Sequence, residues 1–104
     1  MALQDGVGAR HLAASDIPTR VTPYLQAINR ACAATGVQMW VNAESFAGNK
    51  PAPLDRFLAR LDAAHSVTPN VVTYEYSDFW MGTGPGGAAA QALHDGYAAW
   101  LATQ

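Results

Sequence analysis

Two segments of the chain, 37–46 and 70–76, have the pattern expected of β-strands. In the first segment, aliphatic residues alternate with polar and aromatic ones, so its two faces differ in character. One face consists of Val37, Met39, Val41 and Ala43, and the other consists of Gln38, Trp40, Asn42 and Glu44. The second segment is rich in β-branched and aromatic residues, which is typical of strands. Residues 1–8 have the pattern of a strand end that runs into a glycine-rich turn.

Three further segments predict helices. The first begins with Thr22 as N-cap and Pro23 as the first helical residue, and it ends at Gly36. The second begins at Pro53, and the third follows a loop at 77–86. Apolar residues recur at helical spacing in the last two, as Leu54, Phe57, Leu58 and Leu61 and as Leu93, Tyr97, Trp100 and Leu101.

The order β-α-β-α-β-α predicts an α/β fold with a parallel sheet. A doubly wound open sheet and a barrel segment both fit this order. Strands of a doubly wound sheet meet helices on both faces and are almost wholly apolar, whereas 37–46 has one polar face. The pattern therefore favours three consecutive βα units of a (β/α)8 (TIM) barrel. We expect residues 1–104 to form a single partial barrel domain, truncated at its N-terminus, because a full barrel needs about 250 residues.

Composition excludes several classes of partner. The net charge is −2, and the single lysine and five arginines are scattered, so no basic surface for nucleic acid is expected. No apolar run approaches the roughly 20 residues that span a membrane, and from the residues before Leu3 we expect no signal peptide. Cys32 is the only cysteine, so no internal disulfide forms. A single cysteine does not indicate in which redox compartment the protein works.

The chain contains only two glutamates, Glu44 and Glu75, and both lie near the C-terminal ends of predicted strands. Glutamate favours helices over strands, so this placement indicates function. Barrel enzymes place catalytic groups at this rim, where two carboxylates can act on a glycosidic bond. Asp5, at the end of the first strand, is a third catalytic candidate. The alternative is structural: a strand-end glutamate often pairs with an arginine or a backbone N–H, and Asp5 can cap its turn.

Four residues near these carboxylates are candidates for substrate binding: Trp40, Asn42, Tyr76 and Trp80. Their strand pattern puts Glu44 on the face of Trp40 and Asn42. It puts Glu75 on the face of Val71 and Thr73, and leaves Val72, Tyr74 and Tyr76 for the helix side. Aromatic rings offer flat apolar surfaces on which a sugar ring stacks, although such residues are more often part of the core.

Two other patterns give weaker signals. Residues 82–87 match G-x-G-x-x-G, but they begin six residues after the strand and include Pro85, which lacks an N–H. His11, His65 and His94 lie far apart, with no cysteine or carboxylate at metal-ligand spacing. We therefore expect neither a cofactor nor a metal.

Five stretches resemble the carboxyl-terminal part of the DUF4434 family of glycoside-hydrolase-like TIM-barrel proteins. They are LQDGVG (3–8), MWVNAESF (39–46), APLDRFLARL (52–61), VTYEYSDFWM (72–81) and GYAAWL (96–101). The resemblance implies a (β/α)8 barrel with presumed activity on carbohydrate, often in exported bacterial proteins. It implies that Asp5 and Glu44 are rim residues, and it says less about Glu75.

Three functional hypotheses remain open. The first is a fragment of a glycoside-hydrolase-like barrel that acts on or binds carbohydrate through its strand-end carboxylates, with the isolated chain inactive because a partial site cannot position a substrate. The second is a non-catalytic carbohydrate-binding or self-assembling module, in which homo-oligomers close the open sheet edges. The third is a nucleotide-binding open sheet that uses residues 82–87.

Overall fold

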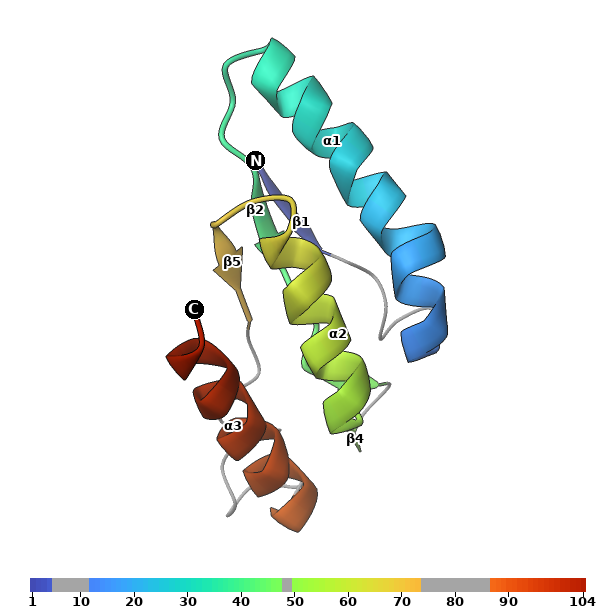
Figure 1. Ribbon diagram of the computed structural model, residues 1–104, viewed down its shortest axis with the longest axis vertical. Helices are drawn as coiled ribbons and strands as arrows, with labels where there is room; N and C mark the ends of the chain where they lie inside the picture. Colours follow the sequence, from blue (N-terminus) through green and yellow to red (C-terminus); the bar gives the residue numbers. More distant parts are fainter. Residues whose placement is uncertain (5–11, 48–49, 74–86) are drawn as a thin grey trace.

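The computed structural model describes residues 1–4, 12–47, 50–73 and 87–104. Within them, three short strands form a parallel sheet: β1 (Ala2–Gln4), β2 (Trp40–Asn42) and β5 (Val71–Val72), in the spatial order β1-β2-β5. Neighbours in the sheet are thus also successive strands of the βα series, as they are in a barrel (Figure 1). The predicted parallel sheet is confirmed.

A helix follows each strand. The helices are α1 (Thr22–Ala34), α2 (Leu54–His65) and α3 (Gly87–Ala102), and α2 packs between the other two (Figure 1). Helix α1 ends as the sequence predicts, because Gly36 adopts the left-handed φ of +70° that glycine tolerates best. Helix α2 begins at Leu54, and Pro53 is its extended N-cap residue.

The helices cover one face of the sheet. Leu3, Val41 and Val71 lie opposite one another in the strand register and point to that face, where they pack against the helices. One core cluster joins α1, α2 and Val41, and a second joins α2, α3 and Ala43. The aliphatic side of the second strand therefore meets helices, as its alternation predicts.

The other face of the sheet is open within the described residues. Trp40 is 41% exposed and Val72 is 39% exposed on it. Covering on one side, as the described residues show it, fits a barrel segment. The predicted parity of the third strand is wrong: Val71 packs toward the helices and Val72 faces away from them, since Val72 pairs with Asn42 in the register. The parity argument therefore no longer supports an inward-facing Glu75, which lies outside the described residues.

The first helical segment begins earlier than predicted. A 3₁₀ turn, η1 (Ala14–Asp16), and a π-helical turn, η2 (Ile17–Val21), lead directly into α1. Thr22 has helical dihedral angles and is not the N-cap, so that prediction is wrong. A regular α-helix would set the Pro23 ring against the carbonyl four residues earlier, and the wider π turn accommodates the proline.

The strands are shorter than predicted, and the segment after β2 forms a separate hairpin. β3 (Phe46–Ala47) and β4 (Lys50–Pro51) pair antiparallel there.

The apolar stripe of α3 also differs from its prediction. Leu93 is buried and Tyr97 and Trp100 pack against the second cluster, but Leu101 is 49% exposed.

Two side chains hold the start of β2 against the segment that precedes β5. The Thr68 hydroxyl and the Asn70 amide both donate to the Met39 carbonyl oxygen, each at 3.1 Å. Thr68 is buried, and its oxygen also accepts the Asn70 backbone N–H at 3.2 Å. This polar cluster lies at the N-terminal end of the strands, opposite the end that carries Glu44.

Candidate functional site

Glu44 lies at the C-terminal end of β2. The Ala43 N–H donates to the Val72 carbonyl at 2.9 Å, so strand pairing reaches Ala43 and Glu44 is the next residue. Its side chain is 1% exposed. In parallel barrels this end of the strands carries the chemistry. The predicted position of Glu44 at the end of a strand is confirmed, and its side chain is buried there.

The segment that follows Glu44 folds back on itself. Ser45 is fully buried, and its carbonyl accepts the Ala52 N–H at 2.9 Å. Beyond it, Phe46 pairs with Pro51 across the β3–β4 hairpin. Glu44 is therefore held between a parallel strand and a hairpin, both of which use main-chain hydrogen bonds. Such a support restricts where the carboxylate can move.

Arg60 supports this segment from helix α2, and the sequence analysis missed it. The side chain is 1% exposed, and both terminal guanidinium nitrogens donate to the Phe46 carbonyl at 3.4 Å. A fully buried arginine needs polar partners. The signal was present: residue 60 falls on the buried stripe with Phe57, Leu61 and Ala64, at the i, i+3, i+4, i+7 spacing where apolar residues are expected. These hydrogen bonds link α2 to Phe46 of β3, two residues after Glu44.

Trp40 and Asn42 lie on the open face of the sheet. Asn42 is half-buried, and its Oδ1 is shielded from solvent with no hydrogen-bond partner. A buried acceptor without a donor costs about 1–3 kcal/mol, so this atom favours a ligand hydroxyl or N–H. Trp40 is exposed on the same face, two residues earlier in the strand. Thr73 Oγ1, one residue after β5, is a buried hydroxyl oxygen that also has no partner.

The other predicted site residues lie outside the described residues. They are Asp5, Glu75, Tyr76 and Trp80, together with residues 82–86 of the glycine-rich motif. The last glycine of that motif, Gly87, is described and begins α3 with a φ of +53°. The structure thus places Trp40 and Asn42 on β2 and Glu44 two residues beyond its end, and Arg60 contacts the main chain at Phe46.

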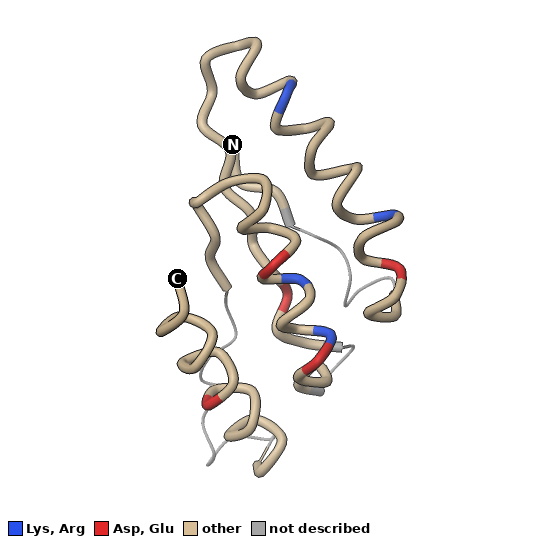
Figure 2. Tube along the Cα trace, viewed as in Figure 1, with Lys and Arg blue, Asp and Glu red and all other residues tan. Residues whose placement is uncertain are grey.

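Metal-ligating and charged side chains do not gather elsewhere in the described part of the chain. No group of at least three His, Cys, Asp or Glu residues there could hold a metal ion. The nearest approach is the exposed pair of His94 Nδ1 and Asp95 Oδ1, 3.3 Å apart. A hydrogen bond from Gln91, and then one from His94, hold the pKa of Asp95 below its usual range. Figure 2 shows the acidic and basic residues scattered along the chain trace.

Among the helices that the structure describes, none combines the length and apolar character needed to cross a bilayer.

Comparisons with known proteins agree with the fold. A family model described as "Domain of unknown function (DUF4434)" matches residues 1–88. The crystal structure of "a putative alpha-L-fucosidase from Bacteroides thetaiotaomicron VPI-5482" matches with a TM-score of 0.70 and 26% sequence identity. That match covers 99% of this chain and 31% of the Bacteroides chain, so this chain spans about a third of its length. The search of curated proteins returned no match. The fold is glycoside-hydrolase-like.

Proposed function

The chain belongs to the DUF4434 family, and we propose that it supplies part of the active site of a carbohydrate-processing (β/α)8 barrel, with Glu44 as a catalytic carboxylate. The observation that carries this proposal is the position of Glu44: a buried carboxylate directly after the last paired residue of β2. This is the strand end where barrel enzymes place their reacting groups.

Glu44 has two possible roles in glycoside hydrolysis. As general acid it protonates the oxygen of the leaving group, and as nucleophile or base it acts on the anomeric carbon or on water. Asp5 or Glu75 is the proposed partner carboxylate. A separation of about 5–5.5 Å between the two carboxyl groups predicts retention of configuration, and about 6.5–9.5 Å predicts inversion.

Substrate contacts come from the same side of β2. The unpartnered Oδ1 of Asn42 accepts a hydrogen bond from a sugar hydroxyl in this proposal, and the exposed Trp40 stacks on the apolar face of a ring. Tyr76 and Trp80 are proposed as further contacts. Arg60 holds the Phe46 carbonyl, and therefore positions the loop that carries Glu44 without touching the substrate.

The first test uses the matched Bacteroides protein, in which the strand is part of a longer chain. Superposition of this chain on its crystal structure identifies the residue at the position of Glu44. We expect a carboxylate there, pointing to the barrel axis. We expect its replacement by the matching amide to slow hydrolysis of aryl α-L-fucosides by about 10²–10⁴-fold, with sugar binding retained.

The second test uses this chain. Glu44→Gln keeps the shape of the side chain and removes its charge, so we expect glycan binding, measured by calorimetry, to change less than about threefold. Ser66→Ala, on an exposed hydroxyl at the end of α2, is the matched control. A neutral residue at the Glu44 position of the Bacteroides protein, or unchanged hydrolysis in its amide variant, contradicts a catalytic Glu44.

A second candidate function is self-assembly without catalysis, and the open sheet favours it. Within the described residues β1 and β5 each pair on one side only, and Trp40 and Val72 are exposed on the uncovered face. Unpaired strand edges bind further strands readily. In this candidate a second copy of the chain covers the face and its edges.

The test of self-assembly is the molar mass in solution. Multi-angle light scattering is measured on the wild-type chain and on Val72→Lys, which puts a charge on the open face beside the edge of β5. Self-assembly predicts an oligomer for the wild type and dissociation for the variant. Ala98→Lys, on an exposed position of α3, is the control and leaves the oligomer intact. A monomeric wild type at high concentration contradicts this candidate.

A further inference from the structure

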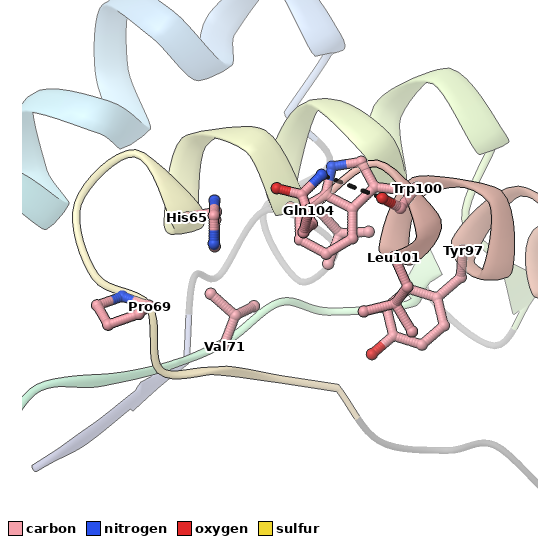
Figure 3. A pocket seen from close by; sticks show the side chains of 8 residues that line it. His65, Pro69, Val71, Tyr97, Trp100, Leu101 and Gln104 are labelled. Carbon is pink, nitrogen blue, oxygen red and sulfur yellow. Dashed lines mark hydrogen bonds between the residues drawn. The ribbon is translucent and has the colours of Figure 1, made fainter.

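A pocket of about 230 Å³ opens between the C-terminal ends of α2 and α3, away from Glu44. Pro69 and Val71 form its side next to the start of β5, whereas Glu44 follows the end of β2. The pocket is therefore at the opposite end of the parallel strands from the proposed catalytic site. Figure 3 shows His65, Pro69 and Val71 on one side of the opening and the side chains of α3 on the other.

Aromatic side chains give this pocket a fixed wall. The rings of Tyr97 and Trp100 are nearly parallel, with an interplanar angle of 13° and centroids 6.3 Å apart. His65 meets Trp100 edge to face at 5.6 Å. The Trp100 indole N–H donates to Asp62 Oδ1 at 2.7 Å, which fixes the rotation of the ring. Because these contacts already orient the wall, a ligand would lose less free energy in ordering it.

The lining combines apolar surface with polar groups. Pro69, Val71 and Leu101 provide apolar walls, while His65 and Gln104 bring nitrogen and oxygen atoms to the pocket. No lysine or arginine lies among its described lining residues, so an anion would find no permanent counter-charge there. The lining therefore suits a small neutral ring with one apolar face and a hydroxylated edge, which is the chemistry of a pyranose.

We propose that this pocket is a second carbohydrate site, which binds one neutral sugar residue against Trp100. The choice of a sugar rests on the proposed function, but the pocket does not depend on Glu44 being catalytic. One sugar ring offers few atoms for contact, so the dissociation constant is expected on the order of millimolar.

The experiment follows the indole N–H of Trp100 by heteronuclear NMR in the intact chain. Its cross-peak is assigned with Trp100→Phe, because Trp40 and Trp80 give the other two indole signals. Methyl α-L-fucoside and methyl α-D-glucoside are the neutral probes, and glucuronate is the anionic one. We expect a saturable shift of the Trp100 signal with at least one neutral probe and none with glucuronate.

The deciding variant is Leu101→Asp, because Leu101 is 49% exposed and its replacement spares the buried core. We expect it to weaken sugar binding by about tenfold or more, by placing an unpartnered charge on the pocket wall. Tyr24→Ser changes another exposed large hydrophobic side chain, on α1 and outside the pocket, and leaves binding unchanged.

Two results overturn the proposal: no shift of the Trp100 signal with any neutral probe, or wild-type affinity in Leu101→Asp. Glu44→Gln separates this proposal from the previous one. If the pocket binds sugar equally well in Glu44→Gln while the amide variant of the Bacteroides protein keeps full hydrolysis, the pocket stands and the catalytic role of Glu44 fails. If hydrolysis is lost but no sugar enters the pocket, the opposite holds.

Discussion

The same three strands give the sheet two faces with opposite environments. On the helix side, Leu3, Val41 and Val71 form a row that the helices cover, and Val41 is fully buried. On the other side, Trp40 and Val72 remain exposed, although each directly adjoins a residue of that row in its strand. The alternation of residues therefore corresponds to two different environments: helices cover one face, and the described residues leave the other face exposed.

The largest predicted effect concerns Arg60, a buried arginine on the helix side of the sheet. Arg60→Ala removes both hydrogen bonds to the Phe46 carbonyl and leaves a cavity, so we expect the free energy of unfolding in urea to fall by about 3 kcal/mol. Arg30→Ala, an exposed arginine on α1, should change it by less than about 0.5 kcal/mol. Equal effects of the two variants would show that Arg60 is not a structural tie.

The next prediction compares the two faces with one substitution. Val71→Thr puts a hydroxyl on the covered face, which should cost about 1–2 kcal/mol of unfolding free energy because the group loses water without a designed partner. Val72→Thr makes the same change on the open face and should cost less than about 0.5 kcal/mol. Thermal and urea unfolding measure both, and a larger loss for Val72 would reverse the assignment of the faces.

A smaller effect tests how closely the helices cover their face. A Cβ atom on Gly96 would overlap the end of the Leu54 side chain, so α3 packs closely against the start of α2 at residue 96. The gain in helix propensity, about 1 kcal/mol, offsets part of this overlap, and Gly96→Ala should lower stability by about 1 kcal/mol in total.

The matched experiment for Gly96 is a double-mutant cycle. Leu54→Ala removes the obstructing side chain, so Gly96→Ala should become neutral or stabilising in that background. Additive losses in the double variant would indicate that the two helices do not meet at these residues.

The smallest prediction concerns pH on the exposed side of α3. Hydrogen bonds from Gln91 and His94 lower the pKa of Asp95 in the folded chain, so the contribution of Asp95 to stability is present above the ordinary carboxyl pKa and is lost as the pH falls through the lowered folded value. Asp95→Asn should abolish this acid-dependent loss. Carbon-detected NMR titration of the carboxyl groups provides the measurement, and an Asp95 pKa at or above its usual range contradicts it.

The sequence was sufficient for the fold because the fold depends on periodic patterns. Alternation in 37–46 correctly separated Val41 from Trp40, and the glycine at 36 correctly ended α1. The pattern of 70–76 was misread because Val71 and Val72 have identical side chains: in a segment without alternation, only the register with β2 decides which valine meets the helices.

The candidate site was only partly predictable. Glu44 stood out because glutamate is unusual at a strand end. Arg60 was overlooked because a long cation on a helix is normally solvated, and its burial depends on the Phe46 carbonyl, which a distant part of the chain supplies. Likewise, the pocket beside Trp100 requires α2, α3 and β5 to meet, and no local pattern encodes such a meeting.

The polar cluster at Met39 has a consequence for how this sheet can change over evolutionary time. Thr68 and Asn70 both donate hydrogen bonds to the Met39 carbonyl oxygen, just before the first paired residues of β2 and β5. A shift of β2 by one residue in the register would turn Trp40 toward the helices and Val41 away from them. The Thr68 hydroxyl and the Asn70 amide, at the opposite end of the strands from Glu44, therefore help to set which face of the sheet carries Trp40 and Asn42. Substitutions near Glu44 can alter what the site does, whereas changes at Thr68 and Asn70 remove hydrogen bonds that hold the register of β2.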